Sequence, residues 1–204
     1  MDIRFSVIIP TVGRPSLTDV LKDLLTELPE EDEILVVGDG PQPAARALAE
    51  GLGGRVRYLE HGPTKDWGHS QRNAAMRVAL GTHIMTMDDD DRVVVGAGRA
   101  IRSRVAEAPD RVHFFRMYHQ QGVIWNFRQV RECNVSTQMV VVPNVPGRLG
   151  VWGNRYEGDY DFITSTVALY PGGEADAVWH EEITVVHGIR GGLSDHPPDV
   201  IRRH

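Results

Sequence analysis

The sequence predicts an α/β fold, with an open, mostly parallel and twisted sheet that is flanked by helices. Short apolar runs alternate with amphipathic stretches of about a dozen residues over the first half of the chain. This alternation is typical of parallel βαβ units. A run of four aspartates, residues 88–91, directly follows one apolar run, at the position where open α/β sheets bind ligands.

The spacing of apolar residues locates the elements of the first half. Leucine and valine recur at helical spacing from Leu17 to Leu28, after Ser16 as a candidate N-cap and before Pro29. We expect Gly81 to end the third helix. The expected strands cover residues 5–9, 33–37, 56–59 and 83–87, and the expected helices cover residues 17–28, 44–52 and 70–80.

The second half is less regular and predicts a smaller region with mixed elements. Its loop at 143–156 is rich in Gly, Pro and Asn, and its length suggests a binding role. An apolar helical face then runs from Asp159 to Tyr170. The other expected elements are a helix at 98–106, strands at 112–117, 122–127, 137–142 and 182–186, and a poorly ordered tail at 194–204.

Composition limits the class of protein. A chain of 204 residues is long enough for one domain with a sizeable core. Its net charge of −6 argues against general nucleic-acid binding, which needs a basic surface. Cys133 is the only cysteine, so no intrachain disulfide can form. Without a long apolar run or a signal-peptide pattern, we expect no transmembrane anchor and a cytoplasmic protein.

The aspartate run, Asp88 to Asp91, suggests a metal site. Adjacent carboxylates repel one another, so an ordered segment tolerates them only with a compensating positive charge. Clustered oxygen ligands favour a hard divalent cation, Mg²⁺ or Mn²⁺, which commonly bridges substrate phosphates. The alternative is a solvated acidic turn, which is what most charge runs are.

Polar or glycine-rich loops follow two other expected strands, at 10–14 and at 38–40. In a parallel sheet these strand ends and the aspartate run point the same way and can converge on one nucleotide. Asp39 could accept a hydrogen bond from a base, although Asp-Gly is also a common turn pair.

Arg72 lies near the start of the third expected helix and on its apolar side, so its side chain is expected to point inward. A buried arginine needs a carboxylate or a phosphate partner. An internal salt bridge to the aspartates and a contact with a ligand are both open.

Two further positions in the second half could carry chemistry. Asp159 begins an apolar helical stripe beside Trp152, Tyr156 and Glu157, a combination that suits sugar recognition and general-base catalysis. A helix cap is the alternative. His187 ends the last expected strand and could complete a metal site, and Arg190, which follows it, could meet a phosphate.

These motifs together resemble glycosyltransferase family 2, which has the GT-A fold. The resemblance is close in the first half and looser in the second. It rests on the segments 6–11, 36–40 and 72–75, on Gly81 and the Asp88-x-Asp90-Asp91 pattern, and then on 156–159 and His187.

The resemblance implies a nucleotide-diphosphate sugar donor, with a UDP-sugar favoured, a divalent Mn²⁺ or Mg²⁺ ion, and transfer to an acceptor hydroxyl with inversion. It implies a nucleotide-sugar-binding half at 1–92 and an acceptor and catalytic half of the same domain at 93–193. Asp159 would be the general base, although Glu157 is not excluded because Gly158 interrupts the usual Glu-Asp pair. The expected donor contacts are Pro10, Thr11, Arg14, Asp39, Arg72, Asp88, Asp89 and Arg190. The expected metal ligands are Asp88, Asp90 and His187, and the expected acceptor contacts are Trp152, Tyr156 and Glu157.

Two other classes of function are compatible with the same motifs. A sugar-phosphate nucleotidyltransferase also uses a metal on an α/β sheet, but residues 10–14 are a poor version of its glycine-rich loop. A non-catalytic nucleotide-binding module would need Asp159 only as a helix cap. The identity of the acceptor does not follow from the sequence.

Overall fold

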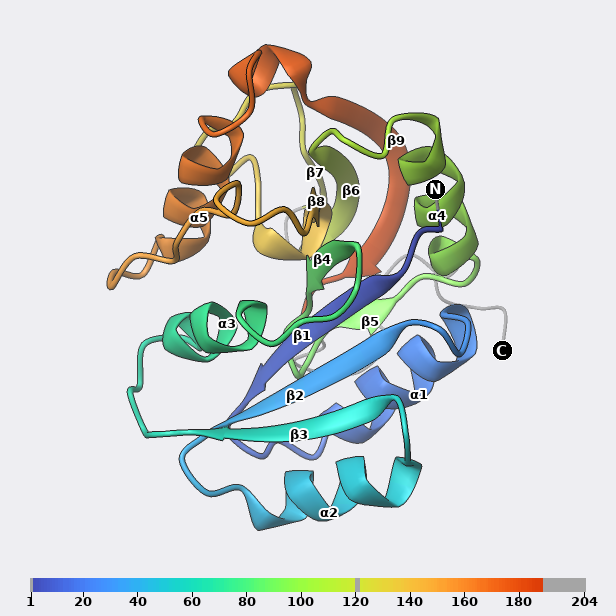
Figure 1. Ribbon diagram of the computed structural model, residues 1–204, viewed down its shortest axis with the longest axis vertical. Coiled ribbons are helices and arrows are strands. Elements are labelled where there is room, and N and C mark those ends of the chain that lie inside the picture. The colour runs from blue at the N-terminus through green and yellow to red at the C-terminus, as the bar shows by residue number, and fades with distance from the viewer. Residues whose placement is uncertain (1, 120–121, 189–204) are drawn as a thin grey trace.

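The computed structural model describes residues 2–119 and 122–188, and it confirms the expected α/β architecture (Figure 1). Within these residues one nine-stranded sheet has the order β3-β2-β1-β4-β8-β6-β9-β5, with β7 paired to β6. The strands are β1 (Phe5–Thr11), β2 (Glu33–Asp39), β3 (Val56–His61), β4 (His83–Thr86), β5 (Arg92–Val93), β6 (His113–His119), β7 (Gly122–Ile124), β8 (Val140–Pro143) and β9 (Val178–Val186). The helices are α1 (Leu17–Glu27), α2 (Pro43–Leu52), α3 (His69–Met76), α4 (Ala97–Glu107) and α5 (Gly158–Val167), with 3-10 turns η1 (Thr137–Met139) and η2 (Gly173–Asp176).

The first four strands form the parallel part of the sheet. β1 lies between β2 and β4, and β3 pairs with β2, all in parallel. The carboxyl ends of β1, β2 and β4 therefore meet at one edge, as the sequence predicts. The loops that carry the expected nucleotide and metal residues leave from this edge.

Alternation along β1 explains how helices cover both faces of the sheet. Phe5, Val7 and Ile9 are buried in one cluster with the apolar stripe of α1. Ile8 points to the other face, where it packs in a second cluster with Ala75 of α3. Full burial of each such large side chain contributes about 1.5–3 kcal/mol, so both faces stabilise the sheet.

The second half extends the same sheet. β4 pairs antiparallel with β8, β8 pairs antiparallel with β6, and the long β9 lies parallel to β6 (Figure 1). The two halves therefore share one sheet. Their division into a donor half and an acceptor half remains a proposal, and the expected tail at 194–204 lies outside the described residues.

Several expected boundaries are wrong. The third helix ends at Met76, not at residue 80, and Gly81 does not cap it. Gly81 instead lies against β1, where a Cβ would be 2.6 Å from the backbone nitrogen of Ser6. Ser16 has helical backbone angles, and its hydroxyl caps no backbone group of the described chain. Such details depend on neighbouring elements, which periodicity does not report.

The second half contains the largest differences. The segment expected as a strand at 137–142 starts as the 3-10 turn η1 and becomes a strand only at Val140. β7 ends at Ile124, β9 begins four residues before the expected start, at Val178, and the short strand β5 has no sequence signal. No helix in the described ranges is long and apolar enough to cross a bilayer.

Candidate active site

The four aspartates form the turn between β4 and β5, at the carboxyl edge of the parallel strands. Asp89 and Asp91 are buried, with 1% and 0% of their surface exposed. The alternative of a solvated acidic turn is therefore wrong. Each aspartate has a different environment. Asp89 is paired inside the protein, whereas the carboxylates of the other three lie close together.

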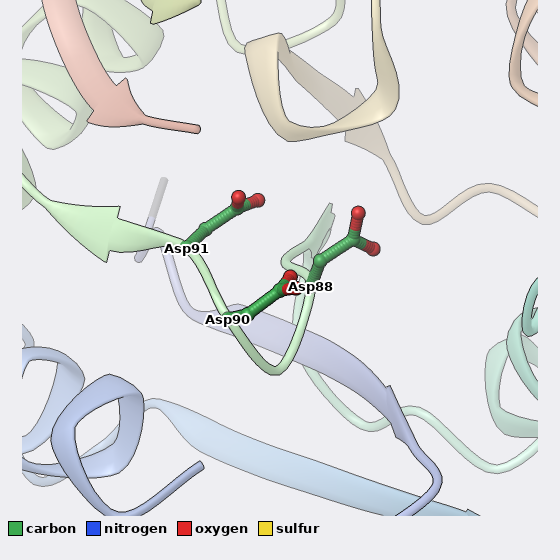
Figure 2. Close-up of side chains that lie close together, drawn as sticks. All are labelled: Asp88, Asp90 and Asp91. Carbon is green, nitrogen blue, oxygen red and sulfur yellow. The ribbon is translucent and has the colours of Figure 1, made fainter. Parts of the chain in front are cut away.

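Asp88, Asp90 and Asp91 form the cluster. One carboxylate oxygen from each lies within 4.8 Å of the others, and Figure 2 shows the side chain of Asp90 directed toward that of Asp88. Burial raises the pKa of Asp91 well above its ordinary value, and the charge of Asp88 adds to this. Burial also raises the pKa of Asp90, although 27% of its side chain remains exposed to solvent. Asp90 and Asp91 are therefore costly to ionise without a cation.

The same cluster fits a hard divalent cation. Oδ1 of Asp91 accepts a hydrogen bond from the backbone N–H of Gly188 at 2.8 Å. Its Oδ2 is buried and has no hydrogen-bond partner in the described part of the chain. A buried oxygen without a partner needs an explanation, and an ion bound by oxygen ligands supplies one. The sequence contains Asp91 in the aspartate run, but the expected ligand set omits it.

His187 follows β9 and lies near this cluster without belonging to it. Its ring packs on His119 with a centroid distance of 4.5 Å, and its charge favours the ionised form of Asp90. Nδ1 of His187 is buried without a hydrogen-bond partner among the residues described. A role in the metal site stays a prediction. Arg190 lies outside the described residues.

The end of β1 is held by Asp89. Thr11 Oγ1 donates a hydrogen bond to Oδ2 of Asp89 at 2.6 Å, and Arg14 forms an ion pair with Oδ1. Pro10 packs against Gly68, where a Cβ would lie 2.6 Å from the Cβ of the proline. These side chains shape the loop after β1. The expected donor contacts by Pro10, Thr11 and Asp89 stay a prediction. Arg14 remains half exposed.

Arg72 points inward, as the sequence predicts, with 4% of its surface exposed. It forms an ion pair with Asp88 Oδ1, and its Nη1 donates to the backbone oxygen of Trp67 at 2.9 Å. Of the two open alternatives, the internal salt bridge is therefore present. Nε of Arg72 is buried and finds no partner within the described ranges.

Asp39 fastens the segment between β3 and α3. Its Oδ1 accepts hydrogen bonds from the backbone N–H of Thr64 at 2.7 Å and from Gln71 Nε2 at 2.8 Å. Its Oδ2 accepts a longer bond of 3.2 Å from the backbone N–H of Lys65. Asp39 is therefore more than a turn residue, and its contact with a nucleotide base stays a proposal.

Asp159 lies in the first turn of α5. Its Oδ1 accepts a hydrogen bond from the backbone N–H of Tyr160 at 2.8 Å, and Ser136 Oγ lies 3.3 Å from its Oδ2. Burial raises the pKa of Asp159 above its ordinary value, while the bond from Ser136 opposes this shift. A carboxylate with raised proton affinity is suited to take a proton from a hydroxyl.

A chain of polar contacts connects Asp159 with the aspartate cluster. Ser136 Oγ also contacts Oε1 of Gln138, and Gln138 Nε2 donates to Asp88 Oδ2 at 2.7 Å. Ser136 and Gln138 are functional candidates that the sequence does not indicate. They come from the turn before β8, and a pattern that resembles a strand gives no reason to single them out.

The loop at 144–157 is attached to α3. The side chain of Asn73 exchanges two hydrogen bonds with the backbone of Trp152, both of 3.1 Å, and His69 Nδ1 contacts the backbone oxygen of Gly153 at 2.9 Å. The ring of Trp152 stacks on Phe162 with a centroid distance of 3.6 Å and is only 3% exposed. The expectation that Trp152 offers its ring to an acceptor is therefore wrong.

Tyr156 and Glu157 lie at the surface of this loop. Tyr156 is 71% exposed and contacts the ring of Trp67. Glu157 forms a 3.3 Å ion pair with Arg155 and is about half exposed. Both positions are open to solvent, as an acceptor contact requires, and their roles remain proposals.

The family model for glycosyl transferase family 2 matches residues 6–132, which is more than half of the chain. The chain belongs to glycosyltransferase family 2. The matched range contains all but the first residue of β1, the aspartate turn and Arg72. It ends before Ser136 and Asp159, so the family match does not test the roles of these two residues.

Solved structures share the fold of this family 2 chain. Staphylococcus aureus TarS superposes with a TM-score of 0.72 at 15% identity, covering 92% of this chain and 37% of TarS. TarS 1-349 in complex with UDP-GlcNAc gives 0.73 at 16%, covering 95% of this chain and 60% of that one. The mannosyltransferase PcManGT from Pyrobaculum calidifontis, in complex with GDP-Man and Mn²⁺, gives 0.64 at 17%, covering 94% and 59%.

These similarities show a GT-A fold, and the identities are too low to carry substrates across. The family 2 chain spans between 37% and 60% of the length of these proteins. A search of curated proteins finds no match to the sequence.

Proposed function

We propose that this chain is a glycosyltransferase that moves a sugar from a nucleotide-diphosphate donor, with a UDP-sugar favoured, to an acceptor hydroxyl. One observation carries the proposal. The aspartate cluster at the carboxyl edge of the parallel strands is connected through Gln138 and Ser136 to Asp159. Membership of family 2 favours sugar transfer over nucleotidyl transfer.

Asp88, Asp90 and Asp91 are the residues that would hold a divalent Mn²⁺ or Mg²⁺ ion, with His187 beside them. When bound, the ion would offset the negative charge of the leaving diphosphate. The buried oxygen of Asp91 without a partner and the raised pKa values of Asp90 and Asp91 support this assignment. The Mn²⁺ complex of the mannosyltransferase with the same fold supports it as well.

The donor would lie along the ends of β1 and β2. Arg14 is half exposed, and its Nε lies 3.8 Å from Oδ2 of Asp90. Its guanidinium can therefore turn toward diphosphate oxygens. Asp39 would accept a hydrogen bond from the base through Oδ2, which has the weaker internal contact. Arg72 would act indirectly, because its ion pair with Asp88 holds that carboxylate in place. On this assignment residues 1–92 form the donor half and residues 93–193 form the acceptor half of one domain.

Asp159 would act as the general base. It takes the proton of the acceptor hydroxyl while the hydroxyl oxygen bonds to the anomeric carbon, and the nucleoside diphosphate leaves from the opposite face. The configuration of the transferred sugar is therefore inverted. Glu157 is less suited, because it is exposed and paired with Arg155, whereas burial raises the proton affinity of Asp159.

The test is incubation of the protein with UDP-sugars and Mn²⁺, with and without saccharide acceptors. Release of UDP with loss of the donor supports sugar transfer, pyrophosphate formation supports a nucleotidyltransferase, and donor binding without turnover supports a binding module. Asp159→Asn should lower turnover by about 10²–10⁴-fold and leave donor binding nearly unchanged.

Asp19→Asn is the matched control for the helix-cap alternative, because Asp19 also lies in the first turn of a helix and is exposed. It should leave turnover unchanged. Near-full turnover of Asp159→Asn would exclude the base assignment.

A further inference from the structure

Two exposed aromatic rings meet at the rim of the site. Trp67, from the segment between β3 and α3, is 57% exposed, and Tyr156, from the loop before α5, is 71% exposed. Their ring centroids are 5.7 Å apart and the planes cross at 83°. The rings therefore form an open corner with apolar faces.

The position of Trp67 in this aromatic corner is fixed by the backbone around it. Trp67 has a φ of 59°, in the left-handed region that a bulky residue rarely adopts. The preceding Asp66 accepts hydrogen bonds from Ser70 and Thr64, and Arg72 donates to the backbone oxygen of Trp67. An unfavourable conformation persists only where the surroundings enforce it, and such conformations gather at ligand sites. The indole is therefore held in an exposed position.

The loop that carries Tyr156 is attached to the start of α3. His69 holds the backbone of Gly153 at 2.9 Å, and its ring lies 5.9 Å from the ring of Trp67. Gly158 packs so closely on His69 that a Cβ would overlap the imidazole. Both aromatic segments are therefore anchored to the same helix end, and the corner is a built feature of the surface.

The corner lies next to the proposed catalytic groups. Tyr156 is three residues before Asp159, and Arg72 connects the backbone of Trp67 with Asp88. We propose that Trp67 and Tyr156 form a subsite that binds a neutral sugar ring of the acceptor. The inference rests on the proposed function and adds the class of acceptor, a carbohydrate.

The surrounding charges favour a neutral sugar. Arg155 is paired with Asp161 at 2.6 Å, Glu157 at 3.3 Å and Glu132 at 3.4 Å, all on or near the loop that carries Tyr156. One cation faces three carboxylates, so this rim repels phosphate and accepts hydrogen bonds from hydroxyls. A sugar ring presents C–H groups to an aromatic face and hydroxyls to such a rim.

The binding test uses the fluorescence of Trp67. Of the four tryptophans, Trp125 and Trp152 are buried and Trp179 is half-buried, so acrylamide should quench Trp67 most, and Trp67→Phe separates its signal from that of Trp179. The probes are neutral tetrasaccharides of glucose and of N-acetylglucosamine in β-1,4 and α-1,4 linkage, their phosphorylated forms, and UDP with Mn²⁺. At least one neutral probe should reduce quenching about twofold or more, and Trp67→Phe should lose the response.

The subsite proposal would be wrong if only UDP, only the phosphorylated probes, or no probe at all reduced the quenching of Trp67 by acrylamide. This measurement needs no turnover, so it can fail while sugar transfer is established, and the reverse is also possible.

The kinetic test uses the ratio of sugar transfer to donor hydrolysis by water. Trp67→Ala and Tyr156→Ala should raise the KM for the protecting saccharide and lower this ratio about tenfold, while Tyr156→Phe, which keeps the ring, should restore it. Val151→Ala removes another exposed apolar side chain from the same loop and is the control. An unchanged ratio in both alanine variants would exclude the subsite.

Discussion

Single residues in this site are defined by what surrounds them more than by their type. Asp89 and Asp91 lie two residues apart in the sequence and are both buried, yet both oxygens of Asp89 are paired with Thr11 and Arg14 while Asp91 keeps an oxygen without a described partner. The first therefore stabilises the loop after β1. The second has a buried oxygen for which a bound cation would supply the missing partner.

Asp91→Asn should separate stability from metal binding. Burial raises the pKa of Asp91 in the folded state, so its ionisation destabilises the metal-free protein as the pH rises above the unfolded value. At neutral pH the metal-free variant should melt about 2–4 °C higher, which corresponds to ~1 kcal/mol. Its stabilisation by Mn²⁺ should disappear in thermal-shift measurements. A full Mn²⁺ shift in the variant would exclude Asp91 as a ligand.

Ser136→Ala should change the pH dependence of turnover. The hydrogen bond from Ser136 favours the ionised form of Asp159, so its loss raises the pKa of the base. A general base works when deprotonated, and therefore the acidic limb of the kcat profile should move to higher pH while the plateau changes less. Thr164→Ala, an exposed change on α5, is the control. An unmoved limb would show that Ser136 does not act on the base.

At the scale of elements, close packing decides what local propensity cannot. Helices α2 and α4 each contain a glycine, a residue that weakens a helix by about 1 kcal/mol relative to alanine. A Cβ at Gly51 of α2 would meet nothing within 4 Å. A Cβ at Gly98 of α4 would overlap the backbone carbonyl of Glu27 at the end of α1.

The two substitutions should therefore have opposite signs. Gly51→Ala should stabilise the protein by about 0.5–1 kcal/mol, because only the helix propensity changes. Gly98→Ala should destabilise it by about 1–3 kcal/mol, because α1 and α4 must separate. Urea unfolding of both variants checks this. Equal effects would mean that the contact between the helices adapts without cost.

At the scale of the molecule, three buried histidines lie in the sheet. His83 of β4, His113 of β6 and His180 of β9 are buried, and His113 Nδ1 contacts His180 Nε2 at 2.9 Å. The other ring nitrogen of His113 contacts the backbone oxygen of Ala108. Burial lowers the pKa values of all three, that of His113 to about 4.

Acid should therefore destabilise the whole fold. The unfolded chain binds protons at histidine near pH 6.5, whereas folded His113 binds them only near pH 4. The stability that this difference contributes is complete above pH 6.5 and is lost as the pH falls toward 4, by up to about 3 kcal/mol. His113→Gln should flatten this decline in urea unfolding at several pH values. An equally steep decline in the variant would assign the effect to other groups.

Sequence patterns alone determined the order of strands and helices in the parallel half, because apolar runs and amphipathic periods are local signals, although they misplaced the end of α3. They also determined the convergence of loops at the ends of β1, β2 and β4, because parallel strands leave no other arrangement. The inward direction of Arg72 and the aspartate site follow from the same reasoning. These features are local, or they follow from one rule of topology.

Only the tertiary structure decided which members of the motifs face the site. Trp152 and Tyr156 belong to one loop, yet packing on Phe162 buries the first and leaves the second exposed. Ser136, Gln138 and Trp67 reach the site from segments without any local signal. Contacts between residues far apart in the chain set these positions, and no periodicity within one segment records them.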